Sequence, residues 1–206
     1  MTRQWTPEEA RAWYAKYPWL RGCNFIGSDC CSRIDMWQSL HAKEHLETAD
    51  RELALAKSIG FNTIRLLIEF DVWYQEHDSF MDILEQYITL AAKNGQIVLL
   101  TLANEAVISR GEFKLKPLGE QTYALGYHQG RLPLTPEQAA LNPVHPLEVE
   151  PWRSSYLEMV REIVTKYGHD SRVLAWNVYN EPGITIHERA VPLLDMLFEE
   201  IRKLDP

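Results

Sequence analysis

The residues best suited to catalysis lie at the end of the stretch Val173–Pro182, which reads VLAWNVYNEP. The stretch is apolar and aromatic at first, which predicts a strand, and it ends in Asn180, Glu181 and Pro182. Proline lacks a backbone N–H, so Pro182 ends the ladder and starts a loop. A glutamate at the end of a strand can give and take a proton as a general acid and base. The tripeptide alone is common, so its meaning depends on the elements before it.

Apolar stretches alternate with amphipathic helices along the chain, an order that predicts βαβ units and a parallel sheet. The predicted strands are Leu20–Ile26, Asn62–Phe70, Gln96–Ala103 and Arg172–Asn180, and the predicted helices are Pro7–Lys16, Ala49–Ile59, Ser79–Lys93, Pro151–Tyr167 and Pro192–Leu204. No linker divides residues 1–206, which predicts a single domain. The connection 104–150 is unusually long, and such loops are often functional.

The two faces of the predicted strands differ in polarity. Alternate residues of a strand point to opposite faces, and here one face is apolar while the other carries charged and amide side chains. A doubly wound sheet is covered by helices on both faces, whereas a barrel turns one face inward to its active site. The pattern therefore favours a barrel. The polar faces carry Thr63, Arg65, Leu67 and Glu69 on the second strand, and Ala175, Asn177, Tyr179 and Glu181 on the fourth.

Composition excludes several classes of protein. The 206 residues are 46% hydrophobic and 24% charged, which is ordinary for a globular chain and excludes a disordered one. The formal net charge of −8 and the lack of a basic cluster argue against a nucleic-acid partner. The longest apolar stretch, Ile97–Ala103, is too short to span a bilayer, which argues against a membrane protein. The N-terminus lacks the apolar core of a signal peptide, so a cytoplasmic location is expected.

Five stretches together resemble a known family. The chain is similar to the retaining β-glycosidases of the (β/α)8 clan that includes glycoside hydrolase family 5, and within it to the cellulase-like and β-xylanase-like group. The resemblance covers nearly all of the chain beyond about residue 19. The stretches are Arg21–Ser28 (RGCNFIGS), Met36–Gln38 (MWQ), Gly60–Ile68 (GFNTIRLLI), Gly126–His128 (GYH) and Asp170–Gly183 (DSRVLAWNVYNEPG).

The resemblance implies an α/β fold of the TIM-barrel type and a glycosidase that acts on β-linked oligo- or polysaccharides without cofactor or metal. It makes Glu181 the acid/base of a retaining mechanism, in which this group protonates the leaving oxygen and then activates water. Asn180 would hydrogen-bond the sugar 2-hydroxyl, and Arg65 would lie beneath the nucleophile. Further candidates for contact with sugar are His128 and the aromatic residues Trp37, Trp73, Trp152 and Tyr179.

The sequence departs from the family pattern in its second carboxylate. The family takes its nucleophile from the end of strand seven. Residues 1–206 account for a short N-terminal helix and about four β/α units, which is half of the eight units of a barrel. The His that the family carries at the end of strand two is replaced by Glu69. The acidic pair after strand three reads Asn104-Glu105. The chain is therefore expected to be an incomplete, truncated form of the glycosidase.

Three ways to supply the missing carboxylate stay open. The chain is a fragment of a longer enzyme, or two copies associate through the open barrel edges and bring two Glu181 residues together, or Glu105 takes the role. A different class of function is also open, in which the chain binds carbohydrate or acts as a truncated, glycosidase-like protein without turnover.

A remote alternative is a zinc peptidase. His41, Glu44 and His45 match the pattern H-x-x-E-H, in which two histidines on one helix face bind Zn²⁺ and the glutamate acts as base. Only three positions define this pattern, so a solvated polar helix is favoured instead. The cysteines Cys23, Cys30 and Cys31 form no zinc-finger spacing and are interpreted as reduced thiols packed near a strand end.

Overall fold

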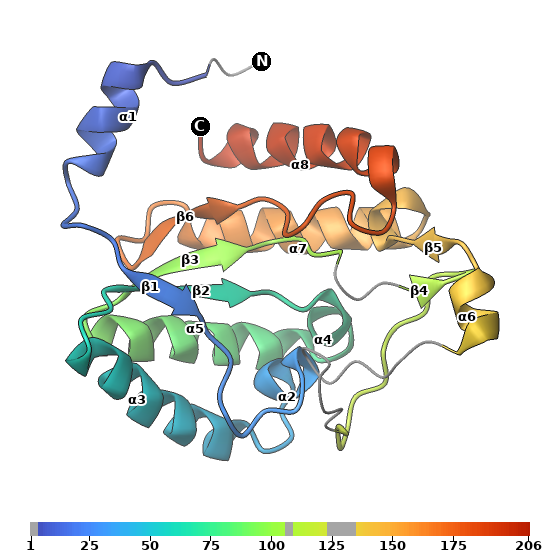
Figure 1. Cartoon of the computed structure of the whole chain (residues 1–206), viewed down its shortest axis with the longest axis horizontal. Coiled ribbons are helices and arrows are strands. Elements are labelled where there is room, and N and C mark those ends of the chain that lie inside the picture. The colour runs from blue at the N-terminus through green and yellow to red at the C-terminus, as the bar shows by residue number, and fades with distance from the viewer. Residues whose placement is uncertain (1–3, 106–108, 123–134) are drawn as a thin grey trace.

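The computed structural model describes residues 4–105, 109–122 and 135–206. Its centre is a parallel sheet with the strand order β1-β2-β3-β6 (Figure 1). These strands are Gly22–Asn24, Thr63–Leu67, Ile97–Thr101 and Val173–Asn177. All four predicted strands are present in the predicted order, each shorter at both ends than the apolar pattern suggested. Consecutive strands in a parallel ladder, with helices between them, are the repeating unit of a barrel.

Most of the helices lie along the sheet or in the connections at its carboxyl end, whereas the N-terminal helix lies apart from it, ahead of the first strand (Figure 1). Their bounds are α1 Pro7–Tyr14, α2 Arg33–Trp37, α3 Ala42–Ser58, α4 Phe70–Gln75, α5 His77–Lys93, α6 Pro136–Ala140, α7 Trp152–Tyr167 and α8 Ala190–Leu204, with 3₁₀ turns at Pro146–Glu148 and His187–Arg189. The five predicted helices are all found, and α3 begins seven residues before the predicted Ala49. The short helices α2, α4 and α6 were not predicted.

The two faces of the sheet differ in burial as the residue alternation predicted. Ile64 and Leu66 of β2 are buried beneath the helices, whereas Thr63, Arg65 and Leu67 on the other face are half-buried. The apolar face packs on α5 and α7 to form one hydrophobic core. The half-polar face is the one that a closed barrel would turn inward.

The sheet has two open edges. The outer strands β1 and β6 each pair on one side only, with no further strand beyond them among the described residues. Every residue of β6 is half-buried, and none is fully buried. Within the same described ranges, no helix is both long and apolar enough to cross a membrane.

The long connection after β3 is more ordered than a plain loop. Its described parts contain a small antiparallel ladder between β4 (Ser109–Arg110) and β5 (Pro143–Val144). The side chain of His145 is buried, and burial lowers its pKa to about 3, so it is neutral. Its Nδ1 accepts a hydrogen bond from the N–H of Leu147 at 3.1 Å.

A group of charges built on two buried carboxylates fastens this connection to the end of β2. Lys116 Nζ lies 2.7 Å from a carboxylate oxygen of Glu69 and 3.0 Å from one of Asp71, and the N–H of Lys116 donates to Asp71 at 2.7 Å. Arg33 of α2 pairs with the other oxygen of Glu69 at 2.9 Å. Against the effect of burial, Lys116 and Arg33 hold the pKa of Glu69 below its usual range. Burial and the neighbouring Glu69 raise the pKa of Asp71 to about 6.

Replacing Lys116 by Met tests how strongly this ion group supports the fold. The variant leaves two buried carboxylates with, among the described residues of this group, Arg33 as their cation, so we expect a loss of about 3 kcal/mol in the free energy of unfolding. Lys114→Met is the matched control, because the Lys114 side chain is 74% exposed and pairs with an equally exposed Glu112. Urea unfolding should show the loss for Lys116→Met and a change within about 0.5 kcal/mol for Lys114→Met. Equal midpoints for the two variants would contradict this role.

Candidate active site

The guanidinium of Arg65 connects three of the four strands at the carboxyl end of the sheet. Arg65 projects from β2 and donates to the amide oxygen of Asn24 on β1 at 3.0 Å. It also donates to Asn177 at the end of β6 and, at 2.7 Å, to Asn180. Thr101 of β3 donates its hydroxyl to the same Asn177 oxygen at 3.1 Å. All four strands therefore contribute to one polar network on the half-buried face.

Asn180 is held in place by backbone and side-chain bonds. Its N–H donates to the carbonyl of Ala103 at 2.8 Å, and a single parallel bridge joins Asn104 and Asn180 beyond the regular ladder. Its side-chain amide donates to the Asn104 oxygen at 2.7 Å, while its own oxygen accepts from Arg65. The orientation of this amide is therefore fixed by two neighbours with opposite hydrogen-bonding roles.

Glu181 follows directly and is exposed, which sets it apart from the other acidic residues at this end of the sheet. Its backbone takes the left-handed conformation with φ of 53°. Burial lowers the pKa of the Arg65 guanidinium, and the negative charge of Glu181 opposes that shift, so the two groups interact electrostatically. An exposed carboxylate beside a fixed cation and a fixed amide can transfer a proton to a bound molecule.

Glu105 lies at the end of β3 and is completely buried, with an exposed fraction of 0%. Its carboxylate accepts from the backbone N–H groups of Gly183 at 2.8 Å and Ile186 at 2.6 Å, and from that of Thr185. The hydroxyl of Tyr179 donates to it at 3.3 Å. Both oxygens are thus occupied by donors from the loop that follows Glu181. The hypothesis that Glu105 supplies the second catalytic carboxylate does not fit this position, because the group is shielded and fully used.

The aromatic candidates for sugar stacking are mostly buried. The indole of Trp37 has an exposed fraction of 0%, donates to the carbonyl of Leu67 at 2.8 Å and packs against Phe80 and Tyr87. Trp73 is buried and donates to Glu162 at 2.8 Å. Tyr179, as described, is bound to Glu105. These three rings present no open face to a sugar, so the structure gives them a packing role.

The remaining candidates are distributed as follows. Trp152 lies at the start of α7, where its ring contacts Phe113 and Tyr74 edge-on. His128 lies outside the described residues. His41 immediately precedes α3 and its ring lies 3.0 Å from Glu120, while Glu44 is exposed in the first turn. The ring centroids of His41 and His45 are 6.3 Å apart.

Parallel strand–helix units of this kind, with polar residues at the carboxyl ends of the strands, are the repeating architecture of TIM barrels. The sequence pattern of the cellulase family, glycosyl hydrolase family 5, matches residues 22–206. The chain therefore belongs to glycosyl hydrolase family 5. Its fold is part of the TIM barrel of this family, as the sequence predicted.

Solved structures of glycoside hydrolases are similar to the chain at low sequence identity. One glycoside hydrolase aligns with a TM-score of 0.48 and 15% identity, over 76% of this chain and 43% of that one. A glycoside hydrolase family 5 protein from Bacteroides vulgatus ATCC 8482 aligns with a TM-score of 0.47 and 12% identity, over 91% and 34%. GH5_18 from Streptomyces cattleya, solved in complex with GlcNAc, gives 0.47 and 14%, over 81% and 39%. The chain thus spans less than half the length of these proteins. No curated protein matches it.

Glu105→Gln tests whether the buried carboxylate holds the loop after Glu181. The amide keeps one acceptor oxygen but turns an NH₂ group toward backbone N–H donors, so we expect the free energy of unfolding to fall by about 2–3 kcal/mol. Glu181→Gln is the matched control, because the same chemical change at an exposed residue should alter stability by less than about 0.5 kcal/mol. Urea unfolding followed by tryptophan fluorescence measures both. A Glu105→Gln variant as stable as the parent would show that the loop does not depend on this charge.

Proposed function

We propose that the chain is a glycoside hydrolase acting on β-linked glycans and that Glu181 is its acid/base. Membership of glycosyl hydrolase family 5 supports the reaction class. The observation that carries the assignment is the contrast between the two strand-end glutamates. Glu105 is buried and bound by the loop, while Glu181 is exposed beside Arg65 and Asn180. In a retaining mechanism such a group first protonates the glycosidic oxygen and then removes a proton from water.

The neighbouring polar residues have distinct proposed roles. Asn180 uses one amide N–H for Asn104 and has a second for a substrate hydroxyl, as the family role of this residue requires. Arg65 holds the Asn180 oxygen and would bind a second, ionised carboxylate at the bottom of the site. The position of His128 in a family stretch leaves it as a proposed sugar contact.

A retaining mechanism also needs a nucleophile about 5–5.5 Å from the acid/base. Since Glu105 is fully occupied, the proposed mechanism needs a carboxylate supplied by a further part of the barrel. The open edges at β1 and β6 are where that part would pair. When the purified chain is alone in solution, a second copy of it can supply strands that pair with both edges. We therefore propose that the chain self-associates through these edges.

Self-association is tested by size-exclusion chromatography with light scattering. We expect the mass of two chains at micromolar concentration, against 24.0 kDa for one. Along β6 the N–H groups of Ala175 and Asn177 face β3, so that of Trp176 between them faces the open edge. Trp176→Pro removes this edge-facing N–H and should shift the species toward the monomer, with Trp176→Ala as the control for loss of the ring. Ala139→Pro in the exposed helix α6 is a control for the substitution itself. A monodisperse monomer for the parent chain would remove this proposal and leave the assignment of Glu181 untouched.

Loss of the acid/base is tested with aryl β-glucosides, β-mannosides and β-xylosides. We expect the self-associated chain, in which the second copy supplies the further carboxylate, to hydrolyse at least one of them, and Glu181→Gln to lower kcat/KM by about 10²-fold or more. Glu188→Gln, an exposed glutamate in the same loop, should keep the parent rate. Equal rates for the two variants would overturn the role of Glu181.

A non-catalytic glycan-binding function is the second candidate, favoured by the engagement of Glu105 in holding the loop. Calorimetry with β-linked oligosaccharides separates the two. A chain that binds an oligosaccharide without turnover, with affinity unchanged by Glu181→Gln, is a binding protein and contradicts the enzyme assignment.

A further inference from the structure

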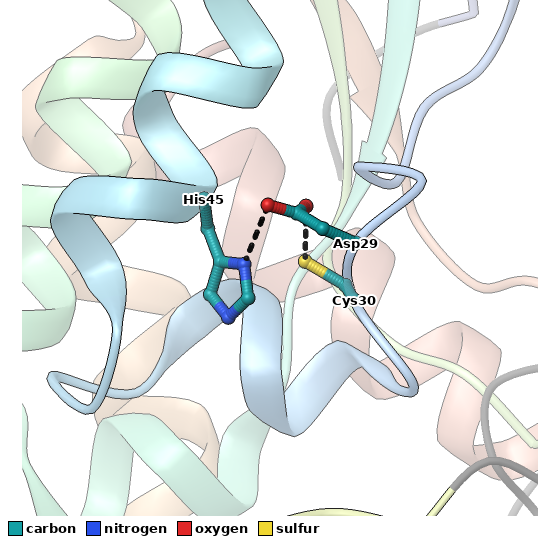
Figure 2. A group of neighbouring side chains, drawn as sticks. All are labelled: Asp29, Cys30 and His45. Atoms are coloured by element: carbon teal, nitrogen blue, oxygen red, sulfur yellow. Dashed lines mark hydrogen bonds and ion pairs between the residues drawn. The ribbon is translucent and has the colours of Figure 1, made fainter.

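Three potential metal ligands meet between the loop after β1 and the helix α3. Asp29 and Cys30 belong to the loop, and His45 lies in the first turns of α3 (Figure 2). A carboxylate oxygen of Asp29, the Sγ of Cys30 and a ring nitrogen of His45 all lie within 4.8 Å of one another. Figure 2 shows the three side chains converging, with Nδ1 of His45 turned toward the Asp29 carboxylate. Cys30 and the other two cysteines form no disulfide.

His45 has an unusual environment for a histidine that serves only packing. Its side chain is buried, with a residue exposure of 8%, and Nδ1 has no hydrogen bond of acceptable geometry. That nitrogen nevertheless lies 3.1 Å from Oδ2 of Asp29. The two atoms are close enough for a hydrogen bond, but their angles are unfavourable for one. A cation between them would use both lone pairs.

The distances fit a zinc ion. Zinc binds His nitrogen and carboxylate oxygen at roughly 2.0–2.1 Å and thiolate sulfur at about 2.3 Å, so tetrahedral geometry sets neighbouring ligands about 3.3–3.5 Å apart. The Asp29–His45 distance of 3.1 Å is close to that value. The Cys30 Sγ lies 3.8 Å from Oδ1 of Asp29, a difference that a small side-chain rotation removes. All three ligand atoms already lie within 4.8 Å of one another, so each would move only a short distance to share one ion.

The surrounding charges also favour a cation. Burial and then the carboxylates of Asp29, Asp35 and Glu52 raise the pKa of the Cys30 thiol, so a thiolate is unfavourable here unless a positive ion joins it. The hydroxyl of Tyr87 is buried without a hydrogen-bond partner and lies in the field of the same group. Thr48, one turn after His45, hydrogen-bonds Asp29 and would orient it as a second layer around an ion.

We propose that Asp29, Cys30 and His45 bind one zinc ion, with water in a fourth position. The site joins the β1–α2 loop to α3 and stabilises that loop. It uses a carboxylate, a thiolate and an imidazole, the ligand types zinc accepts together. It shares only His45 with the H-x-x-E-H pattern, whose other histidine is turned toward Glu120. The proposal is independent of Glu181 and of any glycosidase activity.

The first test uses the full chain, prepared without metal, and titrated with Co²⁺ as a spectroscopic substitute for zinc. We expect one Co²⁺ per chain, a thiolate-to-cobalt charge-transfer absorption, and loss of that absorption when Zn²⁺ is added. Cys30→Ser should abolish the absorption, and His45→Gln should weaken binding by at least 10-fold. The matched controls Cys31→Ser and His41→Gln replace the adjacent cysteine and the other histidine of the H-x-x-E-H pattern, and both should titrate like the parent.

The second test needs no variant and so does not depend on how substitutions fold. Zn²⁺ should slow the alkylation of Cys30 in the parent chain, measured by mass spectrometry of its peptide, and leave that of Cys23 unchanged. Zn²⁺ should also raise the Tm of the parent and of Cys31→Ser but not of Cys30→Ser. A parent chain without the thiolate–cobalt absorption, an absorption that survives Cys30→Ser, or one lost in Cys31→Ser would each overturn the site.

Discussion

The arrangement of the carboxyl end of the sheet depends on a single guanidinium that must be satisfied away from bulk water. Burial makes the charge of Arg65 costly, as the lowering of its pKa shows. The guanidinium is planar and carries five N–H donors, so it needs acceptors in several directions at once. Those acceptors come from Asn24 and from Asn177 and Asn180, which lie on opposite sides of β2 in the sheet. Because β1 and β6 are not neighbours in the sheet, the bonds of Arg65 to Asn24 and Asn177 couple their ends.

The same end of the sheet shows how one kind of side chain acquires two different roles. Glu105 and Glu181 both follow strands, yet one is enclosed by donors and the other is open. A carboxylate surrounded by backbone N–H groups is stabilised in its charged form and fixes a loop. Those donors belong to Gly183, Thr185 and Ile186, so the sequestered glutamate determines the path of the chain just beyond the exposed one.

Much of the fold was predictable from the sequence because alternation within strands reports burial directly. In β2, apolar Ile64 and Leu66 alternate with polar Thr63 and Arg65. This local pattern was sufficient to predict a polar face turned toward the barrel interior. Helix α4 was missed because it begins right after Glu69 with no side-chain cap, and its support comes from Lys116, far along the chain. The role of Glu105 could not be predicted either, because the backbone N–H groups that donate to its carboxylate lie about 80 residues away in the sequence. For Trp37 the sequence suggested a sugar contact that its burial does not support, because an aromatic residue in a family stretch can equally well pack in the hydrophobic core.

The left-handed backbone of Glu181 has a consequence for how this residue can vary. A φ of 53° costs a side-chain-bearing residue about 1–2 kcal/mol relative to glycine, and the bonds of the following loop to Glu105 maintain it. Glycine at this position would relieve that strain and make the folded chain more stable, while removing the only exposed carboxylate beside Arg65 and Asn180 in the described part of the network. Local backbone stability and the proposed proton transfer therefore place opposite demands on this residue.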